Sequence, residues 1–318
     1  MTTASVRYVG NQGRHEEGAI DANVPGTPDG YNPAALAAGC DSGLVLTYTP
    51  ACAATFPYNP NVYGEPGVEV TDFNSNYNAL QVEVNRRLAH GLQFQVAYTW
   101  SRYFDEASNL FNSSFVGVPP SFKGMYAPSA NDAPQRLVIN YYYTLPFYHL
   151  VHQWKRVTDG WTLTGITTFQ HGFPVPVNDS AEPSLTCDGN IASWGCPDKA
   201  NFTSTPEAIG NPRNYTINSA PNYWLNPKSF AIPAPSTGYG NASRNPFYGP
   251  GINNWDLALL KDVHIDEARY FQLRFETFNT FNHAQFGGPY GDVNDPRFGR
   301  IFSAGLGRVV QLAGKFYF

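Results

Sequence analysis

The sequence predicts an all-β fold, an antiparallel transmembrane β-barrel segment of about eight strands, and three observations predict it. Apolar and polar residues alternate in several stretches of up to about ten residues, the length at which a tilted strand crosses a bilayer. The segments that connect these stretches alternate along the chain between long and short. The chain also ends on an aromatic residue, Phe318, that closes one such alternating stretch.

Composition narrows the class of protein further. Only 14% of the 318 residues are charged, and 29 are glycine and 26 proline, whereas typical globular domains are about 25% charged. No run approaches the roughly 18 uninterrupted apolar residues of a membrane-spanning helix, so helical insertion is excluded. The net charge of −5 comes without a cluster of lysine and arginine. Nucleic acid is therefore not predicted as a partner.

Eight stretches carry the two-residue period, and the clearest two form a hairpin. Leu80, Val82 and Val84 alternate with polar residues before a turn at 88–91, and residues 92–101 alternate without interruption after it. This pattern suits a wall with lipid on one side and a polar lumen on the other. Ile166 departs from it. The stretches are Ser5–Val9, 80–85, 92–101, Arg136–Leu145, Trp161–Phe169, Trp255–Val263, Tyr270–Phe278 and Arg308–Phe318.

The connections between these stretches alternate in length, which predicts the topology. Long segments follow every odd-numbered stretch until the chain ends, and compact ones follow the even-numbered stretches. Outer-membrane barrels have short periplasmic turns and longer extracellular loops. An even number of strands with a periplasmic C-terminus makes all long segments extracellular. These segments are 10–76, 105–134, 173–251 and 282–305.

The last ten residues predict the compartment. Gln311 and Lys315 point to one face of the terminal strand, and an apolar set ending in an aromatic residue points to the other. Outer-membrane barrels end in this way, so we expect the outer membrane of a Gram-negative bacterium, with its lipid and the barrel-assembly machinery as partners. We interpret the apolar set as the barrel-insertion signal: Val310, Leu312, Phe316 and Phe318.

The four cysteines form two local pairs, Cys40 with Cys52 and Cys187 with Cys196, in segments rich in glycine, proline, asparagine and serine. Both pairs fall in predicted extracellular loops. We interpret them as disulfide candidates, each stabilising by about 2–3 kcal/mol. Four reduced thiols in a cytosolic protein remain the alternative. Neither pair has the spacing of a zinc site.

Other candidate sites carry weaker signals. His149 and His152 have a metal-compatible spacing but lie in a predicted turn. Residues 291–295 offer oxygens for Ca²⁺ without the downstream bidentate glutamate, so turn chemistry explains them. Glu83, Arg274 and Glu276 suggest either a charge network in the lumen or a hydrated polar wall. No cofactor is predicted.

Loop aromatics and missing motifs bear on function. No phosphate loop, nucleophile elbow or zinc-protease motif is present in the sequence, so an enzyme is not predicted. The aromatic residues of the long segments suit recognition of a saccharide or peptide, and equally the packing of loops against one another. They are Tyr31, Tyr58, Tyr63, Trp194, Tyr223 and Trp224.

Six short motifs in order resemble the C-terminal barrel region of TonB-dependent outer-membrane receptors, specifically the Oar-like group common in Acidobacteria. The resemblance implies a barrel of about 22 strands, an N-terminal plug inside it, and import of a bulky solute driven through TonB. The motifs are Tyr8–His15, Tyr77–Gln81, Ala97–Ser101, Gly160–Ile166, Gly249–Asp256 and Phe275–His283.

The sequence departs from this family in what it lacks. It contains no plug-like segment, and Met1–Arg7 has neither the basic nor the apolar region of a signal peptide. We therefore expect residues 1–318 to be a partial barrel that is transport-incompetent by itself, with TonB engaged only through the missing plug. The alternatives are a self-contained small outer-membrane barrel acting as an adhesin or binding module, and a soluble β-sandwich or propeller.

Overall fold

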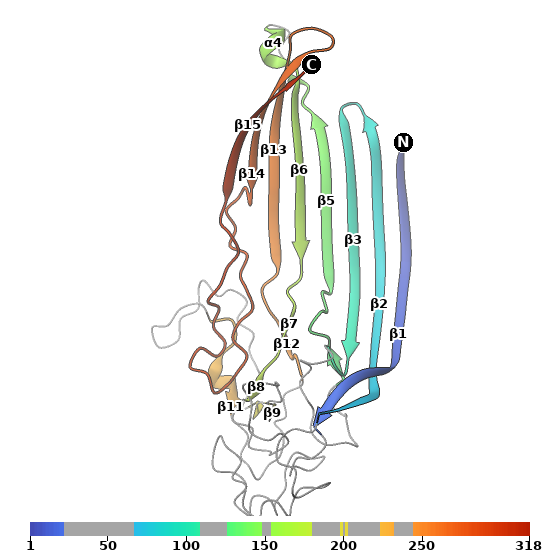
Figure 1. The fold of residues 1–318 in the computed structure, drawn as a ribbon, viewed down its shortest axis with the longest axis vertical. Helices are drawn as coiled ribbons and strands as arrows, with labels where there is room; N and C mark the ends of the chain where they lie inside the picture. Colours follow the sequence, from blue (N-terminus) through green and yellow to red (C-terminus); the bar gives the residue numbers. More distant parts are fainter. Residues whose placement is uncertain are drawn as a thin grey trace, which may run out of the picture.

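A computed structural model describes residues 1–21, 67–108, 126–147, 154–179, 198–199, 201–202, 223–231 and 244–318. Within these ranges one antiparallel sheet dominates (Figure 1). Its eight long strands lie in chain order, each paired with the next: β1 (Thr2–Asp21), β2 (Gly67–Ala89), β3 (Leu92–Asp105), β5 (Gln135–Thr144), β6 (Trp161–Gln170), β13 (Ile252–His264), β14 (Tyr270–Phe278) and β15 (Val309–Tyr317).

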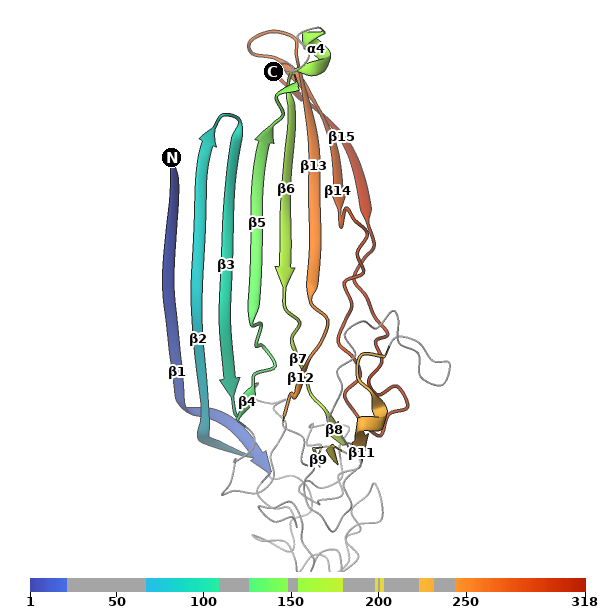
Figure 2. The same ribbon diagram turned by 180° about the vertical axis from the view of Figure 1, so that it is seen from behind.

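The two ends of the sheet differ. At one end, the turn end, the strands are joined by tight connections, one of which contains helix α4 (Lys155–Thr158). At the other end, the loop end, short strand pairs gather (Figure 2). They are β4 (Ala127–Pro128) on β3, β7 (Pro174–Val175) with β12 (Phe247–Tyr248), β8 (Asn178–Asp179) with β9 (Asp198–Lys199), and β10 (Asn201–Phe202) with β11 (Phe230–Ala231). No helix in the described ranges has the length and apolar character that crossing a membrane requires.

All eight predicted stretches are strands, and Tyr270–Phe278 has the predicted bounds. The prediction of one connection over 10–76 is wrong at both ends, because β1 continues to Asp21 and β2 begins at Gly67. These added residues are largely polar on both faces. A strand that leaves the membrane has no lipid-facing side, so the two-residue period that predicts strands disappears there.

The register of the sheet separates its two faces. Residues paired across antiparallel strands share a face, so Leu80 of β2 joins Trp100 of β3 and Tyr8 of β1. The face that contains them, the outer face, is apolar, and many of its side chains are exposed, including Val6 (67%) and Leu312 (76%). Its members include Val82, Val84, Phe94, Val96, Leu137, Ile139, Leu163, Leu257, Leu259, Phe271, Leu273, Phe275 and Phe316.

The opposite face, the inner face, is polar. It contains Glu83, Gln95 and Asn140 in the first half of the sheet and Asp256 and Glu276 in the second. Ile166, which departs from the alternation, also lies on this face and is half exposed there. The two faces therefore have the chemistry of a membrane-facing surface and a lumen.

Glycines with a positive φ shape the turn end. The β2–β3 hairpin closes through His90 (φ 53°) and Gly91 (φ 75°), both left-handed as a tight hairpin with the right twist requires. Gly160 (φ 74°) precedes β6, and its carbonyl accepts a hydrogen bond from the Asp262 amide at 2.9 Å. A Cβ at Gly160 would lie 2.5 Å from the Asp262 carbonyl oxygen, so only glycine fits.

Candidate functional site at the loop end

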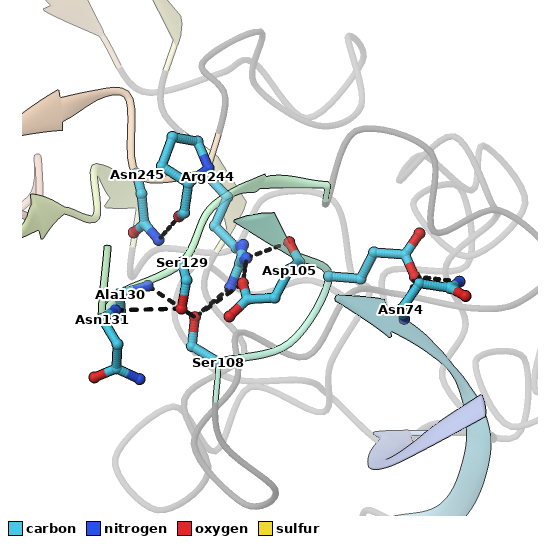
Figure 3. A network of polar contacts seen from close by, with 10 residues as sticks. Asn74, Asp105, Ser108, Ser129, Ala130, Asn131, Arg244 and Asn245 are labelled. Carbon is cyan, nitrogen blue, oxygen red and sulfur yellow. Dashed lines mark hydrogen bonds and ion pairs between the residues drawn. The ribbon is translucent and has the colours of Figure 1, made fainter. Parts of the chain in front are cut away.

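A buried ion pair ties distant loop segments together at the loop end (Figure 3). Arg244, which precedes β12, pairs with the carboxylate of Asp105 at the end of β3, and both side chains are at most 5% exposed. Arg244 also donates to the Asp105 carbonyl oxygen at 2.6 Å and to Ser108 Oγ at 3.0 Å. The adjacent Asn245 donates to the Pro128 carbonyl oxygen at 2.8 Å. The segment before β13 is thereby fastened to the β3–β5 connection.

A second buried carboxylate extends this network. Asp132 accepts hydrogen bonds from the Tyr103 amide at 2.8 Å and from the Tyr248 hydroxyl at 2.5 Å. Arg102 donates to the Tyr248 hydroxyl at 2.8 Å, and the His171 ring meets the Tyr248 ring edge-to-face at 4.8 Å. Burial, and then the hydrogen bond to Asp132, raise the pKa of Tyr248 well above its ordinary value. The phenol therefore stays protonated and keeps donating to Asp132.

An apolar cluster lies beside the polar network. Its buried members are Val175, Val177, Leu225, Phe230 and Phe298, contributed by two different long segments. The Phe230 and Phe298 rings lie 5.1 Å apart in an edge-to-face arrangement. Burial of these side chains gives the loop end a core of its own, which stabilises a defined loop structure above the sheet.

Trp224 joins this core to the polar network, since it packs on the apolar cluster and its indole N–H donates to the Tyr248 carbonyl oxygen at 2.8 Å. Tyr223 is only 8% exposed. For these two aromatic residues the loop-packing interpretation holds. Tyr31, Tyr58, Tyr63 and Trp194 lie outside the described residues, as do His149, His152 and the disulfide candidates Cys40, Cys52, Cys187 and Cys196.

Residues 291–295 form a turn, as the sequence predicts. Asp292 accepts a hydrogen bond from the Asn294 amide at 3.0 Å, and the Asp295 amide donates to the Asp292 carbonyl oxygen at 3.2 Å. The Asp295 carboxylate binds Arg297, which lowers the pKa of Asp295 to about 2. In the part of the chain that the structure describes, no three histidine, cysteine, aspartate or glutamate side chains are grouped as metal ligands would be.

The inner face of the sheet is hollowed into a groove of about 770 Å³ that crosses β2, β3, β5, β6, β13 and β14. Its lining combines amide, hydroxyl and carboxylate groups with a larger share of apolar surface, to which Ile166, Tyr142 and Phe278 contribute. The polar lining includes Asn85, Gln95, Asn140, Thr164, Asp256 and Glu276. A groove of this size and mixed chemistry can hold a solute or a protein segment.

Glu83, Arg274 and Glu276, the charged residues considered from sequence, lie in two separate clusters on the inner face of the described sheet, so they form no single network within it. Glu83 binds Arg7 at 3.4 Å and accepts from Asn85 at 2.6 Å and Gln95 at 3.0 Å. Arg274 binds Glu276 at 2.6 Å on β14. Four strands lie between the two clusters, because β3, β5, β6 and β13 separate β2 from β14.

Sequence reasoning missed the residues that build the loop end. Asp105 and Arg244 are 139 positions apart, and neither belongs to a periodic stretch or a motif with a known mechanism. Only the register of the sheet brings β3 and the approach to β13 together. The predicted terminal signal residues, in contrast, lie where expected, since Val310, Leu312 and Phe316 all face outward on β15.

An antiparallel sheet with an apolar exposed face, a polar inner face, tight turns at one end and long loops at the other defines the wall of a transmembrane β-barrel. The chain belongs to the outer membrane beta barrel domain family, whose model matches residues 1–311. The protein is therefore located in the outer membrane. Its turn end is periplasmic and its loop end extracellular.

One similar solved structure is the outer membrane transporter YddB from Escherichia coli, at 9% sequence identity and a TM-score of 0.47. The likeness covers 100% of this chain and 30% of that chain, so this protein spans less than a third of the length of YddB. No curated protein sequence matches the chain.

Proposed function

We propose that this chain forms part of the barrel wall of a TonB-dependent outer-membrane receptor of the Oar-like type, whose parent protein imports a bulky solute, and that the chain has no enzymatic activity. The observation that supports this most is the open sheet. In the described residues β1 pairs only with β2, and β15 only with β14. Unpaired edges are unfavourable in a bilayer, so further strands are needed to complete the wall.

The motifs behind the resemblance also contact one another, which supports the assignment. The Asp256 carboxylate accepts from the Asn279 amide at 2.8 Å, and the Trp255 and Phe281 rings lie 5.5 Å apart, edge-to-face. Asn279 adopts a φ of 51° and accepts from the His283 amide at 2.9 Å. The Gly249–Asp256 and Phe275–His283 motifs thus form one structure at the extracellular end of β13 and β14.

In this proposal the chain supplies the wall and the extracellular rim, while a plug that is not part of residues 1–318 fills the barrel and couples to TonB. The inner groove is the surface that a solute passes or a plug contacts. By itself the chain binds lipid and the assembly machinery and does not transport. The reading frame upstream of the Met1 codon tests this: in-frame barrel strands, a plug and a signal peptide support it, and a stop codon with a separate ribosome-binding site contradicts it.

A self-contained barrel is the second candidate, favoured by one feature of the topology. With eight alternating strands, β1 and β15 run antiparallel to each other, so their edges are able to pair. A closed barrel resists SDS at room temperature and migrates faster on a gel before heating. Heat-dependent migration of residues 1–318 refolded in detergent would therefore favour this candidate, and its absence would favour the open wall.

The assembly machinery is proposed to recognise the terminal strand through Val310, Leu312, Phe316 and Phe318. Phe318 is 95% exposed, and no neighbouring strand covers it in the described structure. Deletion of Phe318 from a secreted form is expected to reduce the amount of protein in the outer-membrane fraction, while replacement of the lumen-facing Gln311 by serine leaves it unchanged. Equal amounts for both variants would contradict this role.

A further inference from the structure

Arg86 is a charged residue on the membrane-facing side of the barrel wall. It lies on β2 in the same alternating series as Val82 and Val84, opposite Phe94 of β3 and Thr2 of β1. The neighbouring Arg87 belongs to the opposite series, and the edge of the inner groove reaches both residues. Arg86 is half-buried.

The guanidinium of Arg86 has no partner among the described residues. Its Nε is buried and makes no hydrogen bond, and no ion pair includes Arg86. Other cations facing outward are satisfied within the protein. Lys261 contacts the Asp159 carbonyl oxygen and lies 5.6 Å from the Trp161 ring, and Arg102 lies 3.6 Å from Asp132.

The depth of Arg86 in the membrane suits a lipid headgroup. The hairpin turn at His90 is four residues further along β2, which is about 13 Å of strand. Leu88, which lies between them where the pairing with β3 is irregular, is 58% exposed. Arg86 therefore lies close to the periplasmic surface of the bilayer, where an arginine costs about 0–1 kcal/mol instead of the 2–4 kcal/mol at the midplane.

At this depth of the bilayer the anionic group that an outward-facing arginine meets is the phosphate of a lipid headgroup. A guanidinium binds phosphate oxygens through two parallel hydrogen bonds, which lysine cannot reproduce. Phe94 beside Arg86 supplies an apolar surface for an acyl chain. We propose that Arg86 is a binding site for the headgroup phosphate of an anionic phospholipid in the periplasmic leaflet. This site depends on the outer-membrane location and not on coupling to TonB.

Native mass spectrometry of the full chain in mild detergent tests the site, with phosphatidylglycerol and phosphatidylcholine as probes. The wild type is expected to retain more phosphatidylglycerol than phosphatidylcholine, and Arg86→Gln to weaken phosphatidylglycerol binding about tenfold, the effect of losing one charge-assisted contact. Arg87→Gln is the matched control, because it removes the same charge one residue away on the inner face. It is expected to bind like the wild type.

Two further measurements separate the proposal from its alternatives. Arg86→Lys keeps the charge and is expected to retain part of the preference, whereas a general folding defect would remove binding from Arg86→Lys and Arg86→Gln alike. Inorganic phosphate is expected to leave the lipid adduct in place, because the acyl chains also bind. Displacement by inorganic phosphate, equal loss in Arg86→Gln and Arg87→Gln, or no lipid preference in the wild type would each overturn the proposal.

Discussion

Arg244 carries a buried positive charge that pairs with the Asp105 carboxylate. One oxygen of that carboxylate, Asp105 Oδ2, is buried and has no hydrogen-bond partner in the described structure. Asp105 therefore depends on Arg244, since removing one partner of a buried pair leaves an uncompensated charge.

The variant Arg244→Met is expected to destabilise the extracellular end by about 3–5 kcal/mol, the usual cost of breaking a buried ion pair. Denaturant unfolding and limited proteolysis of the loops measure this effect. Arg297→Met is the control, because the Arg297–Asp295 pair is partly exposed, and exposed pairs contribute about 0–1 kcal/mol. Equal loss in both variants would show that burial of Arg244 is not what matters.

Asp295 gives the extracellular loop a defined response to acid. Its carboxyl has a pKa of about 2 in the folded protein against an ordinary 3.8, chiefly because Arg297 donates hydrogen bonds to it. Since the folded pKa is depressed, the stabilisation is complete above about pH 4 and is lost as the pH falls toward 2. A carboxyl-carbon NMR titration is expected to give a midpoint near 2, and near the ordinary value in Arg297→Gln. Identical midpoints in the two proteins would refute the assignment.

At the level of elements, the connection into β6 depends on Gly160. Its φ of 74° and the close Asp262 carbonyl oxygen leave no room for a side chain. Gly160→Ala is expected to lower the free energy of unfolding by at least about 1–2 kcal/mol, the cost of a left-handed alanine. Gly288→Ala provides the comparison, because nothing lies within 4 Å of a Cβ there. A similar small effect in both variants would contradict this account.

The sequence predicts strands well where a membrane imposes alternation. Tyr270–Phe278 contacts lipid on one side and the lumen on the other, so its pattern marks the strand from end to end. Residues 10–21 and 67–76 lie beyond the membrane, where neither face needs to be apolar, and the pattern does not reveal them. The Asp105–Arg244 and Asp132–Tyr248 contacts are unpredictable for another reason: they join segments more than a hundred residues apart that only the completed sheet brings together.

For the molecule as a whole, the same substitution is expected to change stability differently at adjacent residues, because one faces lipid and the next faces the lumen. Leu312 faces outward in the middle of β15, and Ala313 faces inward. Leu312→Arg is expected to destabilise the membrane-inserted protein by about 2–4 kcal/mol, while Ala313→Arg costs less, because the lumen hydrates the charge and only repulsion from Arg274 on the paired strand opposes it. Unfolding from lipid vesicles measures both. If Ala313→Arg proved the more damaging variant, the assignment of the faces would be reversed.

The length of β1 has a consequence for the extracellular rim of the wall. About ten residues suffice to cross a bilayer, whereas β1 has 20. The excess lies outside the cell, and pairing with β2 is interrupted between Gly13 and Gly18. Bulges bend strands, and in Figure 2 this part of β1 turns aside from the strand direction. The extracellular part of the β1–β2 pair therefore projects beyond the membrane, and a few irregularly paired residues, not the membrane-spanning wall, set the direction in which it points.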